Sequence, residues 1–288
     1  MNVQTVPYTA KDAAARFTES LRETGFAVLT DHPVPAELIS DVFEDWRGFF
    51  GSPDKLRYTF DPTVQAGYFP FRTENAKDSP VKDLKEFFHL YPWNPLPAGV
   101  STETRELFDR LSTLAGELLG WIEDHSSDDI RRDLSMPLRR MIENSRDVLL
   151  RPIHYPPLVG SEEIGAVRAA AHEDINLITL LPAATAPGLE VLDSRGRWHE
   201  VPCDPGSLVV NNGDMLQMAT RGLYRSTTHR VVNPIGPGAR ESRYSMPLFL
   251  HPRPEVRLSP EHTAGSYLKQ RLEEIGLVKR QASPPTAA

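Results

Sequence analysis

The chain has 288 residues, of which 40% are hydrophobic and 25% are charged, and its formal net charge is -7. This composition is typical of a globular protein, and the length allows a hydrophobic core that needs no disulfide or metal to hold the fold. The negative charge and the lack of a basic stripe argue against a nucleic-acid partner, and no apolar run approaches the roughly 20 residues of a membrane-spanning helix.

The first half of the sequence is predicted to be mainly helical. Thr9 is a candidate cap for a first helix, and Gly25 is its expected stop. A short strand, FAVLT at residues 26–30, follows. A second helix is predicted to begin after Pro35, because apolar residues then recur at helical spacing: Leu38, Ile39, Val42, Phe43, Trp46, Phe49 and Phe50.

Two further helices are predicted before the middle of the chain. The first has leucines on one face: Leu107, Leu111, Leu114 and Leu118. The second spans residues 130–144 and is expected to be interrupted or bent near Pro137. After about Arg146 the pattern changes to short β-rich runs separated by turn sequences such as DSRGR at 193–197. Many short strands with this spacing predict an antiparallel sandwich, with a double-sheet jelly roll as the candidate.

A last helix is expected over about residues 264–275, and the final residues, QASPPTAA, are too rich in proline and small side chains to pack. We therefore predict an α+β fold. A mainly helical N-terminal region over residues 1–145 packs on a jelly-roll core over residues 146–255. A C-terminal helix and a disordered tail occupy residues 256–288.

The sequence also limits the kinds of site that the protein can have. Its single cysteine, Cys203, excludes an intramolecular disulfide and any zinc or iron–sulfur site built from several thiolates. The first residues, MNVQTVPYTAKD, lack the basic and apolar regions of a signal peptide. We expect a cytoplasmic protein, and a monomer because no exposed apolar stripe stands out.

A candidate metal site lies in the β-rich half. His172 and Asp174 are two residues apart, and on an extended strand such side chains point to the same face. A histidine from another strand, for which His229 is the candidate, completes a facial triad that leaves open positions on Fe(II). With nine histidines and 39 acidic residues, a His-x-Asp/Glu pair is expected by chance about once. The surrounding sequence must therefore decide what the triad means.

That surrounding sequence resembles the isopenicillin N synthase-like family of 2-oxoglutarate/Fe(II)-dependent oxygenases over nearly the whole chain. The segments that carry the resemblance are GFAVLTDHPVP, AGYFP, DLKEFF, HYPP, AHEDINLITLLP, GLEVLDSRGRWHEVP, LVVNNGDMLQMATRGLYRSTTHRVVNP and RYSMPLFLHP. The resemblance implies a double-stranded β-helix, a jelly-roll form, in which His172, Asp174 and His229 hold iron near the open end. It also implies a dioxygenase that uses O2 and 2-oxoglutarate.

The resemblance carries the family's Arg-x-Ser pair onto Arg243 and Ser245, as the site for the distal carboxylate of 2-oxoglutarate. A planar guanidinium can grip a carboxylate through two hydrogen bonds, and a serine one strand step away on the same face adds a third donor. Tyr155 occupies the position whose phenol often joins the same carboxylate in the family. The sequence departs from the plant Asn-x-Tyr motif, because Ile153 stands where the asparagine would be.

The implied reaction oxidises a C–H bond of a small molecule, by hydroxylation, desaturation or ring formation, and releases succinate and CO2. Natural products and amino-acid-like molecules are the default substrates of the family. The reaction requires no side-chain nucleophile or general base. Asn176, Phe69 and Arg72 are candidate substrate contacts, although aromatic residues such as Phe69 more often pack a core.

Three other interpretations stay open on the sequence. An iron oxidase of the same fold that does not use 2-oxoglutarate, such as isopenicillin N synthase or aminocyclopropanecarboxylate oxidase, also retains an Arg-x-Ser pair. A non-catalytic jelly-roll module would bind a structural metal or none, which the intact triad and Arg-Ser pair argue against. A zinc hydrolase is disfavoured because no motif places a companion general base.

Overall fold

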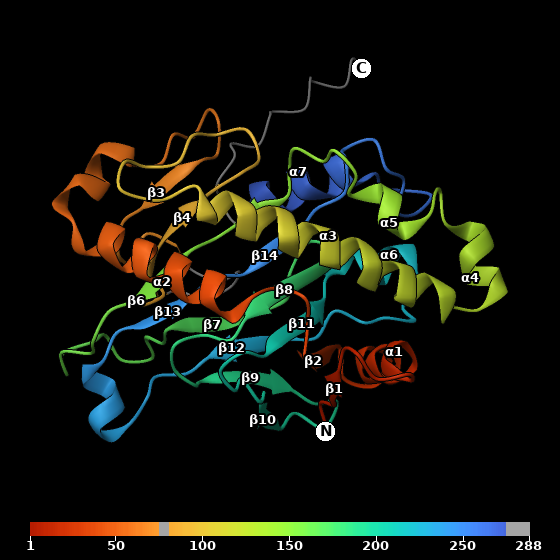
Figure 1. Cartoon of the computed structure of the whole chain (residues 1–288), viewed down its shortest axis with the longest axis horizontal. Coiled ribbons are helices and arrows are strands. Elements are labelled where there is room, and N and C mark those ends of the chain that lie inside the picture. The colour runs from red at the N-terminus through yellow and green to blue at the C-terminus, as the bar shows by residue number, and fades with distance from the viewer. Residues whose placement is uncertain (75–80, 275–288) are drawn as a thin grey trace, which may run out of the picture.

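The structure is a computed structural model that describes residues 1–74 and 81–274 (Figure 1). The tail predicted to be disordered lies outside these residues. The helices are α1 (Ala13–Thr24), α2 (Ala36–Gly51), η1 (Pro53–Tyr58, 3-10), α3 (Glu103–Asp124), α4 (Asp128–Asp133), α5 (Leu138–Met141), α6 (Asp214–Ala219), η2 (Gly236–Arg240, 3-10) and α7 (Ala264–Glu274).

The strands form three sheets. They are β1 (Thr5–Pro7), β2 (Phe26–Thr30), β3 (Gly67–Phe69), β4 (Glu86–His89), β5 (Leu149–Leu150), β6 (Ile153–Tyr155), β7 (Ala169–His172), β8 (Ile178–Pro182), β9 (Leu189–Leu192), β10 (Trp198–Glu200), β11 (Leu208–Asn212), β12 (His229–Val231), β13 (Arg243–Ser245) and β14 (Leu248–Leu250). A six-stranded sheet has the order β1-β2-β11-β8-β14-β5, and two four-stranded sheets have the orders β10-β9-β12-β7 and β13-β6-β4-β3. Except for the parallel pair β1 and β2, neighbouring strands in these sheets run antiparallel.

The six-stranded sheet is covered on both faces. In β8 all five residues are buried, and successive side chains belong to different cores. Leu180 joins the core on the helical side, whereas Leu181 joins a second core with Val209. Because both faces exclude water, the central strands are mostly apolar and do not alternate regularly between apolar and polar residues. The polar exceptions are Thr179 in β8 and Asn211 and Asn212 in β11.

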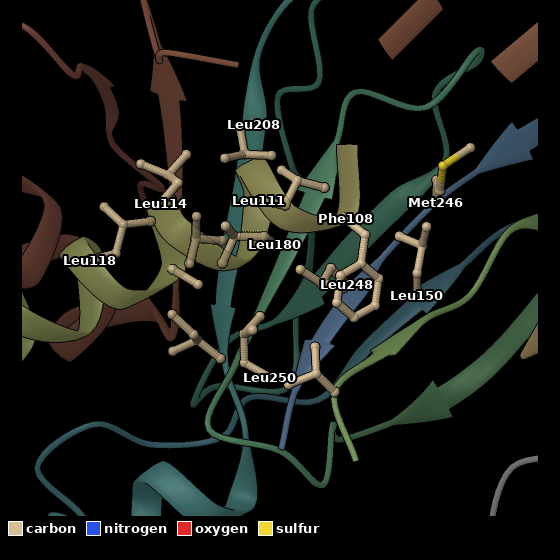
Figure 2. Packing of buried hydrophobic residues seen from close by; sticks show 14 of the residues in the cluster. Phe108, Leu111, Leu114, Leu118, Leu150, Leu180, Leu208, Met246, Leu248 and Leu250 are labelled. Carbon is tan, nitrogen blue, oxygen red and sulfur yellow. The ribbon is translucent and has the colours of Figure 1, made fainter. Parts of the chain in front are cut away.

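Helix α3 covers the outer face of this sheet (Figure 1). Its apolar residues recur every three or four positions, so they form one stripe along the helix. Figure 2 shows that stripe meeting the leucines of the sheet, through Phe108, Leu111, Leu114 and Leu118 on the helix and Leu180, Leu208, Leu248 and Leu250 on the strands. The leucine face predicted for this helix is therefore the contact that joins the helical layer to the sheet.

The second core lies inside the barrel and draws side chains from all three sheets. Its members include Val28, Phe87, Ile153, Val191, Val209 and Val231. The three sheets close around this core as a double-stranded β-helix, which confirms the predicted α+β class with a jelly-roll core. No helix in the described ranges has both the length and the apolar character needed to cross a bilayer.

One predicted helix boundary, the start of the first helix, is wrong. Helix α1 begins at Ala13, about a turn after the expected cap Thr9, and its predicted stop Gly25 adopts the left-handed conformation with φ 77°. The helix predicted over residues 130–144 is interrupted near Pro137, as expected, and forms two short helices, α4 and α5. Pro137 precedes α5 directly, and the residue before a proline is sterically driven away from the helical region, so the helix cannot continue through it.

The N-terminal region contributes more strands than the sequence predicted. Besides β2, it supplies β1, β3 and β4, of which β4 pairs with β6 through Glu86 and Phe87 opposite His154 and Ile153. Strand β2 likewise pairs with β11. Strands from both sides of the expected boundary at residue 145 thus share sheets, and the division into regions there stays a prediction.

The contact between α3 and the six-stranded sheet can be tested by truncating one leucine. Leu111 is fully buried in this contact, so Leu111→Ala should lower the free energy of unfolding by about 2–5 kcal/mol. Leu56→Ala makes the same chemical change at a side chain that is 61% exposed and should change it by less than about 0.5 kcal/mol. Urea unfolding followed by circular dichroism measures both, and equal effects would contradict this packing.

Candidate metal centre

Two neighbouring strands bring the predicted histidines together. His172 ends β7 and His229 begins β12, and these residues are direct partners in the antiparallel pair. Their ring centroids are 4.4 Å apart. Strand β7 ends at His172, so Asp174 reaches the same place from the loop that follows and not from the next step of the strand. The cross-strand register therefore sets the distance between the two rings.

The three potential ligand atoms converge on one point. Oδ1 of Asp174 lies 3.9 Å from Nε2 of His172 and 3.8 Å from Nε2 of His229. One nitrogen or oxygen of each residue lies within 4.8 Å of the others. Such spacing suits three ligands on one side of a single ion, which leaves the other side open.

Both imidazole rings are oriented by backbone carbonyl groups. Nδ1 of His172 lies 2.7 Å from the carbonyl oxygen of Ala170, and Nδ1 of His229 lies 3.1 Å from that of Thr227. An N–H at each Nδ1 donates to the carbonyl, so each Nε2 presents its lone pair to an ion. Desolvation, together with the neighbouring His229, lowers the pKa of His172 to about 4, so its ring is neutral at pH 7.

The carboxylate of Asp174 is held from the opposite sheet. Its Oδ2 accepts hydrogen bonds from Oγ1 of Thr179 at 2.5 Å and from Nδ2 of Asn211 at 2.8 Å, so Oδ1 is left to face the histidines. Burial raises the pKa of Asp174, but His229, His172 and the two hydrogen bonds outweigh it and hold the pKa below its usual value. The group is therefore ionised and oriented.

Asn176 supports this arrangement: the structure places it outside the cavity lining, and its expected role as a substrate contact stays a prediction. The side chain is fully buried, and its Nδ2 donates to the carbonyl of Ile178 at 2.9 Å and to Oγ1 of Thr179 at 3.0 Å. Its backbone lies so close to Gly213 that a Cβ there would collide with the Asn176 carbonyl oxygen. The amide therefore fixes the threonine that in turn fixes Asp174.

The predicted cosubstrate residues also lie together. Arg243 on β13 is the direct partner of Tyr155 on β6, and its guanidinium lies 5.1 Å from the centre of that ring. Ser245 is buried and one strand step further on the same face. Nε of Arg243 donates to the carbonyl of Ala186 at 2.9 Å, but no group in the described residues accepts a hydrogen bond from its buried Nη1.

A second buried arginine, which sequence reasoning missed, lies beside the first. Arg168 is 1% exposed and lies 6.0 Å from the centre of the Tyr155 ring. Its Nη2 donates to the carbonyl of Glu241 at 3.0 Å, and burial and the charge of Arg243 lower its pKa. The hydrogen-bond acceptors of these two side chains among the described residues are neutral backbone carbonyls, Glu241 for Arg168 and Ala186 for Arg243. Two buried guanidinium groups with such neutral partners are typical of a site that binds an anion. The signal in the sequence was a lone arginine directly before a small-residue strand, four positions before His172.

A cavity of about 610 Å³ opens beside the metal ligands. Its charged lining includes Glu74, Asp83, Lys85, Arg151 and Arg271. Helix α7 also contributes Leu268 and Leu272, and it is fastened to α6 by a 2.7 Å hydrogen bond from Tyr267 to Asp214. The C-terminal helix is thus part of the cavity wall.

The two other predicted substrate contacts, Phe69 and Arg72, also lie outside the cavity lining. Phe69 is buried in the second core, where its ring lies 4.1 Å from that of Phe60 and 4.4 Å from that of Phe87. Arg72 lies at the surface, where its Nη2 is 2.8 Å from a carboxylate oxygen of Glu163. Neither residue lines the cavity, because one side chain packs into the barrel and the other extends into solvent.

Comparisons with known proteins agree with this geometry. Residues 146–252 match the family model of the 2OG-Fe(II) oxygenase superfamily. Residues 4–109 match a second family model, which describes the N-terminal region of the non-haem dioxygenase in morphine synthesis. The proline hydroxylase buaE from Petromyces alliaceus is 30% identical over 267 residues, which cover 82% of this chain and 80% of that protein.

Solved structures extend the similarity to the fold. A protein from Shewanella oneidensis assigned as an oxygenase is 48% identical, with a TM-score of 0.87 over 96% of this chain and 100% of that one. A protein from Caulobacter crescentus assigned to the 2OG-Fe(II) oxygenase family is 31% identical, with a TM-score of 0.78 over 95% of this chain and 99% of that one. The likeness therefore covers nearly the whole length of both relatives.

The hydrogen bond from Thr179 to Asp174 can be tested with Thr179→Val, which keeps the shape and removes the donor. We expect metal affinity to fall about 10- to 100-fold, because the carboxylate loses one of the groups that orient it. Thr113→Val is the matched control, since Thr113 lies on α3 and bonds only within that helix. Co(II) titration of the metal-free protein measures both affinities, and equal values for the two variants would refute the role of Thr179.

Proposed function

Because the chain belongs to the 2OG-Fe(II) oxygenase superfamily, we propose that His172, Asp174 and His229 hold its iron. The protein is an Fe(II)- and 2-oxoglutarate-dependent dioxygenase, an oxidoreductase with iron(II) and 2-oxoglutarate as cofactors and O2 as oxidant. The convergence of two Nε2 atoms and one carboxylate oxygen carries the assignment of the ligands.

The donor set fits iron(II). Two imidazoles and one carboxylate on one side of the ion form the triad of non-haem iron oxygenases, and the open side leaves room for organic ligand and O2. The hydrogen bonds behind each ligand support the same assignment, since metal-binding histidines and carboxylates are held by such partners.

The anion site fits the distal carboxylate of 2-oxoglutarate. We assign that carboxylate to Arg243, Ser245 and Tyr155, and we add Arg168 as a second cation. The support is the buried Nη1 of Arg243, for which the described residues offer no acceptor. A carboxylate there would supply both the missing acceptor and a counter-ion.

With iron and 2-oxoglutarate bound, the site supplies an oxidation in which O2 converts 2-oxoglutarate to succinate and CO2 and a substrate C–H bond is oxidised. The protein's own residues orient the participants. Thr179 and Asn211 keep Asp174 turned toward the histidines, and Leu149 and Phe249 contribute apolar surface to the cavity wall. Since no side chain must act as nucleophile or base, the position of the substrate decides between hydroxylation, desaturation and ring formation.

The proposed substrate is a small molecule, such as a natural product or an amino-acid-like compound, because the cavity holds about 610 Å³. The proline hydroxylase among the relatives supports this size class. We further propose a cytoplasmic monomer that binds neither nucleic acid nor membrane. The single cysteine suits a reducing compartment, and the net charge of -7 disfavours a polyanionic partner.

The iron assignment predicts a spectroscopic signature. Anaerobic addition of Fe(II) and 2-oxoglutarate should give a visible metal-to-ligand charge-transfer band, and Asp174→Ala should abolish it. A wild-type protein that shows no band and retains no iron would contradict the proposed function. Succinate formed for each O2 consumed separates this enzyme from an oxidase of the same fold, which would make none from added 2-oxoglutarate.

The cosubstrate assignment predicts a change in affinity. Arg243→Gln should raise the KM for 2-oxoglutarate about 10- to 100-fold, because a charged hydrogen-bonding group is lost from the anion site. Arg110→Gln removes an exposed arginine that pairs with Glu106 on α3, and its KM should equal that of the wild type. Succinate assays at varied 2-oxoglutarate measure both, and an unchanged KM in Arg243→Gln would overturn the assignment.

A further inference from the structure

The cavity beside the metal ligands contains a group of buried charges that the proposed function does not use. Lys85 lies at its centre, with Nζ 2.9 Å from a carboxylate oxygen of Glu74 and 2.8 Å from one of Asp83. Asp83 also accepts a hydrogen bond from the backbone N–H of Ala170 at 3.0 Å. The two carboxylates are therefore engaged by the lysine and the backbone.

Arg151 is the cation of this group whose N–H donors are not all hydrogen-bonded. Its Nη1 lies 3.6 Å from Glu74, which is beyond hydrogen-bonding distance, and no acceptor within the described residues meets its buried Nε. The guanidinium carbon lies 4.8 Å from the centre of the Phe87 ring and 5.2 Å from that of Phe249. Two aromatic rings thus hold the planar group, and they provide no hydrogen-bond acceptor in its plane.

The strand register places Arg151 on the same wall as the iron ligands. Phe249 on β14 is the direct partner of Thr179 on β8 and of Leu149 on β5, so these side chains share one face of the six-stranded sheet. Thr179 on that face donates to Asp174, and Arg151 follows Leu149 by two residues. Arg151 and Asp174 both line the cavity.

The other charged groups of the cavity do not supply the hydrogen-bond acceptor that Arg151 lacks. Glu173 accepts a hydrogen bond from Thr228, and burial raises the pKa of Asp147, which disfavours its negative charge. Arg271 of α7 adds a second guanidinium to the lining, and its Nη1 pairs with Glu274 at 2.7 Å. The wall therefore offers the unfilled donors of Arg151 to a ligand, while the carboxylates of Glu74, Asp83 and Glu173 are held by other residues.

We infer that Arg151 binds a carboxylate of the substrate, so that the enzyme oxidises a small organic acid. The inference rests on the proposed function, because the cavity is a substrate site only if His172 and Asp174 hold the iron. A guanidinium fork pairs with a carboxylate through two parallel hydrogen bonds, which fixes the direction of the bound molecule. The enzyme then has separate arginines for its two acids, Arg243 for 2-oxoglutarate and Arg151 for the substrate.

The test compares acids with neutral molecules of the same shape. The full-length protein is loaded anaerobically with Fe(II) and 2-oxoglutarate and titrated with butyrate, benzoate and phenylacetate, and in parallel with their primary amides. The readouts are the shift of the charge-transfer band, the succinate formed after O2 is admitted, and the KM for 2-oxoglutarate. The proteins are wild type, Arg151→Gln, Arg151→Lys and the surface control Arg110→Gln.

In the wild type and in Arg110→Gln, acids should shift the band at concentrations roughly 10- to 100-fold lower than their amides. Arg151→Gln should lose this preference and keep the wild-type band and KM for 2-oxoglutarate. Arg151→Lys should keep part of the preference, because it retains the charge without the planar fork.

Several results would overturn the inference. The first is that no acid shifts the band of the wild type. The second is that amides bind as well as acids, and the third is that Arg151→Gln keeps the wild-type preference for acids over amides. If an acid abolishes the band and added 2-oxoglutarate restores it, the acid competes with 2-oxoglutarate at Arg243. This result also overturns the inference. The wild-type comparison of acids with amides needs no variant, so it decides the question even if Arg151→Gln does not fold. A wild type that forms no band before any acid is added refutes the proposed function instead.

Discussion

The carboxylate of Asp174 depends on both sides of the barrel interior. Thr179 and Asn211 from the six-stranded sheet bind one of its oxygens, and the histidines of a four-stranded sheet face the other. A buried carboxylate costs several kcal/mol to desolvate, so it is stable there only when such groups are in place. The packing that holds the sheets in position, with α3 on the outside and the second core between them, therefore also sets the ligand distances.

The sequence predicted those parts of the site that lie close together in the chain or follow a recognised motif. His172 and Asp174 are two residues apart, as are Arg243 and Ser245, and the structure brings each pair to one place. The sequence did not point to Arg151, because its place in the cavity depends on contacts with residues of other strands. Its neighbours Phe87 and Phe249 lie on β4 and β14, far from it in the sequence, and no local spacing encodes such a contact.

The same division applies to the fold. The leucine face of α3 repeats at helical spacing, so its burial could be predicted from the chain alone. Strands β1, β3 and β4 contain only three or four residues each, too few for a period to be recognised, and they exist through pairing with distant segments. The three predicted substrate contacts lie outside the cavity lining for a related reason. Asn176, Phe69 and Arg72 are plausible by residue type, but local pattern does not say which side of a wall a residue occupies.

Helix α7 has a consequence for how such enzymes diversify. The iron and 2-oxoglutarate assignments involve residues of the barrel strands and their loops, whereas Leu268, Arg271 and Leu272 reach the cavity from a peripheral helix fastened to α6 through Tyr267. Substitutions on that helix change the space offered to a substrate and leave the strand register around the metal ligands untouched. A lineage of these proteins can therefore acquire new substrates by mutation at its C-terminal end while the oxidising machinery is inherited unchanged.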